Sequence, residues 1–249
     1  MNRFEDKNVL ITGGTSGFGL DAAIVMASEG ARVAVTGHSD DHIEDAKTAL
    51  PDGSIVLKND ASDPQAAKDL VEAVKAEMGS LDCLWLNAGF GEFVPPQKMD
   101  ADTFDKLMNT NVRGPVLQMA GLMDMINDGG AVLLTSSVAP YLGQPAGAVY
   151  GATKAADLAL ARAWASALAD KNIRVNSVAP GPIETNFLSS MDLPKDKEDE
   201  FREQVKSQVP LGRFGESKEV AQVALFLLSD MASYVTGSEY FVDGGMTMR

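Results

Sequence analysis

Two residues able to exchange protons stand four positions apart in the stretch "YGATK". Tyr150 and Lys154 fall in a predicted helix of about 150–170, and their spacing puts both side chains on one helix face, about one turn apart. An ammonium beside a phenol favours the phenolate, which would let the tyrosine act as acid or base at neutral pH. An amphipathic helix with an ordinary exposed lysine has the same spacing, so the pair alone does not decide between these interpretations.

Two further polar residues suit the same chemistry. Ser137 stands 13 residues before Tyr150, at the end of the predicted strand "GAVLLTSS" (130–137), and ligands of open parallel sheets bind beyond the carboxyl ends of the strands. A hydroxyl there can donate a hydrogen bond to a carbonyl oxygen on which negative charge develops. Asn111 falls inside a predicted helix of about 101–126. Asparagine is mildly unfavourable within a helix, which indicates another role for this residue.

A glycine-rich turn with the spacing T-G-x-x-x-G-x-G occupies residues 12–19, between a predicted strand and a predicted helix. Glycines let the backbone approach a ligand closely, and a helix N-terminus offers unpaired N–H groups, so this turn can hold a nucleotide phosphate. A plain glycine-rich corner is the alternative. The stretch "LNAG" (86–89) ends another predicted strand with small residues, against which a cofactor can lie.

The elements that must position these residues alternate along the whole chain. The predicted strands cover residues 8–12, 31–37, 54–60, 81–89, 130–137, 173–181 and 238–245. The predicted helices cover about 19–30, 40–50, 64–78, 101–126, 150–170 and 217–229. Strands separated by helices of this length form βαβ units. We therefore expect an α/β fold, a Rossmann-like doubly wound parallel sheet of about seven strands flanked by helices on both faces.

One segment interrupts this alternation. Residues 182–215 are polar and carry both charge signs, as in "LPKDKEDEFREQ". The segment is either a solvated surface helix or a lid over a substrate site. No linker or repeat divides the rest of the chain, so we expect a single domain over residues 1–249.

Composition excludes several classes of partner. Lys and Arg total 21 against 35 Asp and Glu, a formal net charge of -14, which disfavours nucleic acid and anionic membranes as partners. No apolar run is long enough for a membrane helix. Cys83 is the only cysteine, which excludes an intrachain disulfide and thiolate zinc sites. The two histidines, His38 and His42, fall at a loop and a helix start, so we expect no metal site. The single cysteine and the lack of a long apolar run lead us to expect a cytoplasmic location.

Taken together, these motifs resemble the short-chain dehydrogenases/reductases of the compact single-domain type, over essentially the whole chain. The matching set is the glycine turn at 12–19, N-A-G at 87–89, Asn111, Ser137, Tyr150-x-x-x-Lys154, "PGPIET" at 180–185 and "VDGG" at 242–245. Two positions depart from the family pattern. Leu86 stands where the family often has a second asparagine, and Phe18 where isoleucine is more frequent. Neither departure removes a group that the family's chemistry needs.

The resemblance implies hydride transfer between nicotinamide C4 and a carbonyl or alcohol carbon. By this similarity Tyr150 is the general acid, and Lys154 favours its ionisation and hydrogen-bonds the nicotinamide ribose. Ser137 orients the carbonyl, and Asn111 binds the water that links Lys154 to solvent. A non-catalytic dinucleotide-sensing regulator is the alternative from another class, and it would have no need of these four side chains together.

The resemblance also implies a dinucleotide site along the strand ends. Asp60 matches the position that holds the adenine amino group, Asn87 and Gly89 line the adenosine ribose region, and the Ile183 backbone holds the carboxamide. Thr185 contacts the carboxamide or pyrophosphate, with a local cap as its alternative role. The predicted set is Gly13, Thr15, Ser16, Gly17, Phe18, Gly19, His38, Asp60, Ala61, Asn87, Ala88, Gly89, Tyr150, Lys154, Pro180, Gly181, Ile183 and Thr185.

The end of the second strand bears on the choice of cofactor. NAD-preferring relatives carry a carboxylate there, whereas this chain has Gly37. His38 follows, where NADP-preferring relatives commonly carry arginine, and Ser16 takes a place where they often have a basic residue. Asp40 and Asp41 lie nearby and oppose a phosphate. We expect NADP(H) to be preferred, with NAD(H) as the second cofactor, and His38 as a plain loop residue is the alternative.

The substrate and the assembly are less visible. The stretches expected to wall the pocket are residues 90–96, 138–147 and 186–210, which Phe90, Tyr141, Leu142, Phe187 and Met191 would make mostly apolar. They contain no arginine cluster, which favours a small to medium neutral ketone, aldehyde or secondary alcohol. A 3-oxoacyl-thioester reductase is an alternative, although it would need a basic patch for its acyl carrier. The predicted substrate residues are Ser137, Tyr141, Tyr150 and Phe187. The resemblance implies a homotetramer.

Overall fold

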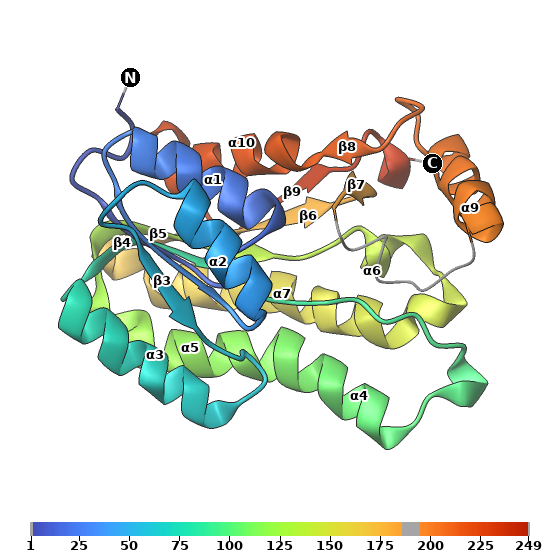
Figure 1. Cartoon of the computed structure of the whole chain (residues 1–249), viewed down its shortest axis with the longest axis horizontal. Helices are drawn as coiled ribbons and strands as arrows, with labels where there is room; N and C mark the ends of the chain where they lie inside the picture. Colours follow the sequence, from blue (N-terminus) through green and yellow to red (C-terminus); the bar gives the residue numbers. More distant parts are fainter. Residues whose placement is uncertain (1, 186–194, 249) are drawn as a thin grey trace.

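The computed structural model describes residues 2–185 and 195–248, the side chains of residues 195–198 excepted. Its centre is a seven-stranded, wholly parallel sheet with the strand order β3-β2-β1-β4-β5-β6-β9 (Figure 1). The strands are β1 (Asn8–Ile11), β2 (Arg32–Gly37), β3 (Ile55–Lys58), β4 (Leu81–Leu86), β5 (Ile126–Thr135), β6 (Arg174–Pro180) and β9 (Glu239–Val242). This order confirms the predicted doubly wound fold, because the chain runs outward from β1 in both directions.

Helices cover both faces of the sheet (Figure 1). One layer holds α1 (Gly17–Ser28), α2 (Asp40–Ala49) and α10 (Ser217–Leu228). The opposite layer holds α3 (Pro64–Glu77), α5 (Gly114–Leu122) and α7 (Ala148–Ala167). Within the described residues, no helix has both the length and the apolar character needed to cross a membrane.

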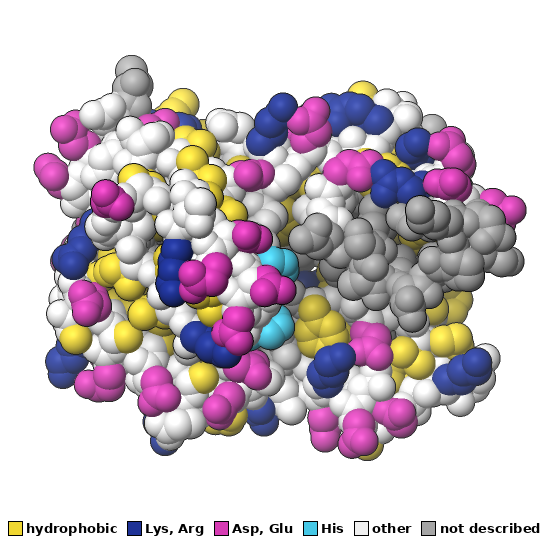
Figure 2. Space-filling model, in the orientation of Figure 1, with side chains coloured by type: hydrophobic (Ala, Val, Ile, Leu, Met, Phe, Trp, Pro, Cys, Tyr) yellow, Lys and Arg dark blue, Asp and Glu magenta, His cyan; other side chains and the backbone are white. Residues whose placement is uncertain are grey.

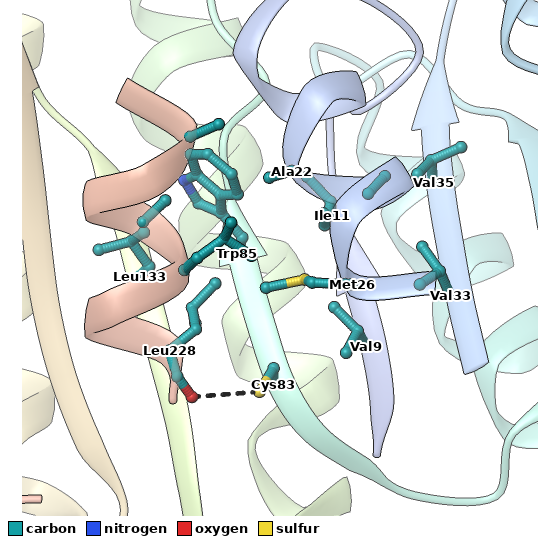
Figure 3. Close-up of a cluster of buried hydrophobic side chains, with 14 of the residues drawn as sticks. Val9, Ile11, Ala22, Met26, Val33, Val35, Cys83, Trp85, Leu133 and Leu228 are labelled. Atoms are coloured by element: carbon teal, nitrogen blue, oxygen red, sulfur yellow. Dashed lines mark hydrogen bonds between the residues drawn. The ribbon is translucent and has the colours of Figure 1, made fainter. Parts of the chain in front are cut away.

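The strands are apolar on both faces because both faces are covered. Val9, Ile11 and Trp85 pack into the cluster under α1 and α10, while Leu10 and Leu84 pack into the cluster under α3 and α5. Figure 3 shows the first cluster, with the Trp85 indole at its centre. Successive side chains of a strand point to opposite faces, so a shift of one residue would exchange the two clusters. The core thereby sets the strand register and the level at which the strands end.

The predicted helix of about 101–126 is shorter and divided in the structure. It consists of α4 (Ala101–Met108), a wider turn of π-helical form (Asn109–Arg113) and α5, and β5 already begins at Ile126. The wide turn contains Asn111, whose side chain bonds to another segment of the chain. Such turns alter the direction of side chains within a helix, and hydrophobic periodicity alone does not reveal them.

The segment 182–215 forms more structure than a single surface helix. A short parallel pair, β7 (Ile183–Glu184) and β8 (Gly215–Glu216), joins its two ends, and α9 (Lys195–Gln208) lies between them. A further short helix, α6 (Ala139–Leu142), follows β5. Figure 1 places α6 and α9 at the end of the molecule toward which β6 points. The role of this segment as a lid stays a prediction.

A buried guanidinium ties α10 to the sheet. Arg174, the first residue of β6, donates hydrogen bonds to Leu227 O at 2.7 Å and Ser229 O at 2.9 Å. The Cys83 thiol donates to Leu228 O at 3.5 Å (Figure 3), and burial raises the pKa of this thiol to about 12. The last carbonyls of α10 have no partner within the helix, so these two side chains end the helix against the strands.

We expect Arg174→Met to lower the free energy of unfolding by about 2 kcal/mol or more, because two buried carbonyls lose their donors. Arg32→Met is the matched control, since Arg32 likewise begins a strand but is an exposed residue 4.0 Å from Glu77, and its change should stay under about 1 kcal/mol. Urea unfolding of both variants measures the difference. Equal losses would contradict the capping role of Arg174.

Candidate active site

The carboxyl ends of β1 and β4 are joined by side-chain hydrogen bonds. The Thr12 hydroxyl accepts from the backbone N–H groups of Asn87 at 3.0 Å and Ala88 at 3.1 Å. Asn87 in turn donates from Nδ2 to Gly13 O at 3.1 Å. The glycine turn and the N-A-G segment, 75 residues apart in sequence, therefore form one rigid floor.

The same floor extends to β5 through a buried threonine. Trp85 Nε1 donates to Thr135 Oγ1 at 2.9 Å, and this hydroxyl donates to Asn87 Oδ1 at 2.8 Å. The indole thereby links the core to the site, because its ring is fully buried while its N–H reaches the strand end. Three neighbouring strand ends are held at fixed positions by these bonds.

The glycine turn is tightly packed against this floor. Gly13 has φ +62°, and a Cβ at this residue would lie 2.8 Å from Ala88 Cα. A Cβ at Gly19 would lie 2.8 Å from Asn87 Nδ2. Helix α1 begins at Gly17 with no acidic residue in its first turn, so its positive end is not neutralised locally. The turn thus has the features that a dinucleotide pyrophosphate needs.

Lys154 of α7 is buried against the end of β5. Its Nζ donates to Thr135 O at 2.7 Å and lies 3.1 Å from Asp157 Oδ2. Burial lowers the pKa of the Lys154 ammonium, but the negative charge of Asp157, together with that of Tyr150 when it is ionised, more than offsets this, and the net pKa is raised above its usual value. The ammonium is therefore charged at neutral pH, as the predicted role of this lysine requires.

Asn111 connects the helix region to the segment after β4. Its Oδ1 accepts from the Phe90 N–H at 3.0 Å, and its Nδ2 donates to Phe90 O at 2.9 Å and Thr153 Oγ1 at 3.1 Å. Both backbone groups of Phe90 are thus held by one amide. The predicted water-binding role of Asn111 stays a prediction, and its side chain here acts as a clamp between α7 and residue 90.

Gly89 leaves space between two of the predicted catalytic side chains. A Cβ at this position would lie 3.1 Å from Asn111 Oδ1 and 3.2 Å from Lys154 Nζ. Contacts this short would displace one of the two polar groups. The missing side chain of Gly89 therefore helps to keep both polar groups in place.

Three of the four predicted catalytic side chains, Ser137, Tyr150 and Lys154, line one cavity of about 210 Å³. Ser137 Oγ accepts from Ala139 N at 3.1 Å, and its hydroxyl hydrogen can point toward a bound oxygen. The Tyr150 ring packs against Phe93, with ring centroids 5.6 Å apart. The other predicted residues in the lining are Phe18, Asn87, Gly89, Pro180, Gly181, Ile183 and Thr185.

The remaining predicted residues lie elsewhere. Tyr141 is outside the cavity lining: its ring packs on Phe241 at 5.0 Å between centroids and its hydroxyl donates to Glu239. Its neighbour Leu142, which was also expected in the pocket wall, does line the cavity. Phe187 lies outside the described residues. The predicted cofactor residues that do not line this cavity are Gly13, Thr15, Ser16, Gly17, Gly19, His38, Asp60, Ala61 and Ala88.

Four lining residues lie within the stretches expected to wall the pocket, although none of them was singled out from the sequence. Phe93 and Gln144 come from the segments after β4 and α6, and Phe201 and Val205 come from α9. The last two stand four positions apart in an otherwise polar helix, a spacing that could have indicated an inward face. Asp157, three positions after Lys154, could likewise have been found from its helical spacing.

The end of the site where adenosine is predicted to bind contains a cation that the sequence analysis did not identify. Lys58 pairs in register with Gly37 across β3 and β2, and its Nζ lies 2.6 Å from Asp40 Oδ1. Both side chains of this ion pair are exposed. Asp60 accepts from the Ser62 N–H at 2.9 Å and so shapes the turn that follows β3.

Known proteins match the chain over nearly its full length. A family model described as enoyl-(acyl carrier protein) reductase matches residues 13–247. The 3-oxoacyl-[acyl-carrier-protein] reductase FabG of Thermotoga maritima is 37% identical over 251 residues, which cover 99% of this chain and 100% of that protein. A solved "short chain dehydrogenase/reductase family protein" is 36% identical with a TM-score of 0.88, over 99% of this chain and 100% of that one. The structure of levodione reductase is 34% identical with a TM-score of 0.90, over 98% of this chain and 99% of that one.

We expect Thr135→Val to lower the free energy of unfolding by about 2 kcal/mol or more, because the buried indole N–H of Trp85 and the side-chain oxygen of Asn87 each lose a hydrogen-bond partner. Thr135→Ser is the matched control, since it keeps the hydroxyl. Urea unfolding of both variants gives the comparison. A valine variant as stable as the serine variant would show that the bridge between the strand ends contributes nothing.

Proposed function

Because the chain belongs to the short-chain dehydrogenase/reductase family of NAD(P)-dependent oxidoreductases, we propose that it is an NADP(H)-preferring reductase of neutral ketones and aldehydes. The observation that carries this proposal is the shared cavity of Ser137, Tyr150 and Lys154 at the strand ends. A protein that only senses dinucleotides would have no need of this combination beside the glycine turn.

The residues divide the chemistry between them. When bound, a reduced nicotinamide would supply the hydride for the carbonyl carbon and would itself be oxidised. The Ser137 and Tyr150 hydroxyls hold the carbonyl oxygen, which gains negative charge as the C–H bond forms. Tyr150 then gives its proton to that oxygen, and the Lys154 ammonium stabilises the phenolate that remains. Burial of Lys154 strengthens this effect because water screens the charge less.

The cavity favours an uncharged substrate. Its walls include Phe90, Phe93 and Leu142, which offer an acid nothing to bind. Two further cations next to lining residues are already paired: Lys106 lies 3.2 Å from Glu92 and over the Phe90 ring, and Arg202, which follows Phe201, pairs with Glu184. An anionic substrate would have to displace these carboxylates.

A 3-oxoacyl-thioester reductase is the second candidate, favoured by the 37% identity to the Thermotoga maritima reductase. Two substrates with the same acyl group separate the candidates: ethyl 3-oxobutanoate, which is neutral, and 3-oxobutanoyl-CoA, whose carrier is anionic. Oxidation of NADPH is followed with each. Higher kcat/KM for the ester supports the proposal, and higher kcat/KM for the thioester supports the second candidate.

We expect Tyr150→Phe to lower kcat by about 100-fold or more, because the proton donor is lost, while NADPH still binds. Tyr234→Phe is the matched control, since Tyr234 is fully exposed and its hydroxyl is remote from the chemistry. Turnover and NADPH fluorescence measure the two effects separately. A phenylalanine variant at position 150 with undiminished turnover would contradict the catalytic assignment.

The preference for NADP(H) is supported by what the end of β2 excludes. Gly37 is buried, and a Cβ there would overlap the Thr15 side chain. A carboxylate at this position would bind the ribose hydroxyls of NAD and repel a 2′-phosphate. Thr15 occupies the space that such a side chain needs, so the glycine is enforced by packing.

A lysine and a histidine near the end of β2 also favour a phosphate. Lys58 lies beside Gly37 in the β2–β3 register, and His38 follows Gly37 as an exposed residue. Figure 2 shows both histidines of the chain on one face with acidic side chains around them. A 2′-phosphate would compete with Asp40 for Lys58, which limits the discrimination between the two cofactors.

We expect Gly37→Asp alone to weaken binding of both cofactors, because the new side chain overlaps Thr15. The double variant Gly37→Asp with Thr15→Gly should bind NADH better than NADPH, since the carboxylate then fits and repels the 2′-phosphate. Thr15→Gly alone is the control and should keep the NADPH preference. Parallel fluorescence titrations with the two cofactors test this, and a double variant that still prefers NADPH would contradict it.

We also propose that the chain forms a homotetramer, as its family resemblance implies. Strand β9 is the edge of the sheet, and Phe241 on this strand packs with Tyr141 in an exposed aromatic pair. An exposed sheet edge with apolar side chains suits contact with another copy.

A further inference from the structure

A buried carboxylate, Asp157, is ion-paired with Lys154 on the same helix. The residues stand three positions apart on α7, Lys154 Nζ lies 3.1 Å from Asp157 Oδ2, and the side chains are 5% and 4% exposed. We propose that Asp157 is a positioning residue, which holds the Lys154 ammonium in place and sets the highest pH at which Tyr150 can act as an acid. This role rests on the proposed function.

The ammonium is held from two directions. It has three N–H donors, of which one is directed to Thr135 O at the end of β5 and one to Asp157 Oδ2 on α7. Acceptors on a strand and on a helix leave the group little freedom to turn. One N–H remains for the side of the site where Tyr150 and the cofactor ribose would lie, and the missing side chain of Gly89 keeps that space open.

Packing does not require a carboxylate at this position. Asp157, Ala161 and Ala165 follow each other at intervals of four, and both alanines are buried in the cluster between α7 and the sheet. An alanine at position 157 would continue this apolar stripe. Burying a carboxylate instead costs free energy, and burial raises the pKa of Asp157 to about 6, above its usual range. The protein is therefore less stable with a carboxylate at position 157 than with an apolar residue. What the carboxylate provides in exchange is its interaction with Lys154.

The charges around Asp157 come from α7 and β9. Lys154 lowers the pKa of Asp157, and Glu239 on β9 raises it. Glu239 accepts a hydrogen bond from Tyr141, and it lies beside Ser177 in the β6–β9 register. Glu239 thus acts on Asp157, whereas Asp157 is the carboxylate whose charge raises the pKa of Lys154 against the effect of burial.

The sign of the effect follows from these charges. Asp157→Asn keeps the size and a carbonyl oxygen but removes the negative charge. Burial then lowers the pKa of Lys154 with less opposition. While Lys154 remains charged, its attraction for the Tyr150 phenolate is no longer offset by a neighbouring carboxylate. Carbonyl reduction needs Tyr150 protonated and Lys154 charged at the same time. In either case one of the two groups loses its proton at a lower pH than in the unaltered enzyme, so activity is lost at a lower pH.

The kinetic test uses the full chain with NADPH and ethyl 3-oxobutanoate. We expect the alkaline limb of the kcat/KM profile to move down by roughly one pH unit in Asp157→Asn. Asp157→Glu should return it toward the unaltered enzyme because the charge is restored. Asp170→Asn, an exposed residue just beyond α7, is the matched control and should leave the limb in place. A uniform loss of rate with an unmoved limb would overturn the proposal and leave Asp157 a structural residue only.

A second measurement does not depend on turnover. The phenolate absorbance of Tyr150 is obtained as the difference between each protein and its Tyr150→Phe counterpart during an alkaline titration. The titration of the phenolate should move in Asp157→Asn, to lower pH if Lys154 is still charged and to higher pH if Lys154 has lost its proton first. The thermal midpoint is recorded to show that both proteins are folded. If the unaltered chain reduces no carbonyl, the proposed function fails, yet this titration still decides on Asp157. Coincident titration curves would overturn the inference.

Discussion

A positive charge held inside the protein is the constraint on which the rest of the site depends. Lys154 is 4% exposed, and an ammonium removed from water is costly unless acceptors and negative charge surround it. Thr135 O and Asp157 supply these from β5 and α7. Strand and helix must therefore meet in one fixed arrangement, and Gly89 must leave room for the charged group.

The parallel sheet makes this arrangement possible because its strands end at one edge. The Thr12, Asn87 and Thr135 side chains bond three strand ends together. Trp85 of β4 packs in the core, and its indole N–H donates to Thr135 at the end of β5. Core packing and site geometry are thus coupled, since one indole belongs to both.

In the proposed function, selectivity at both ends of the site would come from the ligands that the site excludes. Thr15 fills the space that a carboxylate at Gly37 would need, so the ribose corner keeps a glycine beside Lys58. At the cavity, Lys106 and Arg202 are each paired with a glutamate, which leaves these cations less able to bind an acid. Packing and local charge pairing would then restrict the ligands without a dedicated recognition group, and the net charge of -14 further disfavours an anionic substrate.

The sequence by itself determined the alternation of strands and helices, because hydrophobic periodicity is a local property, and it placed Ser137 and the N-A-G segment at strand ends. It also showed the helical spacing of Tyr150 and Lys154. Only the tertiary structure decided which residues face the cavity: Tyr141 turns to Glu239, while Phe201 of α9 turns inward. The wide turn at Asn109–Arg113 and the neighbours Gly37 and Lys58 likewise depend on contacts between distant segments. Such contacts arise from packing and strand register, which no local pattern contains.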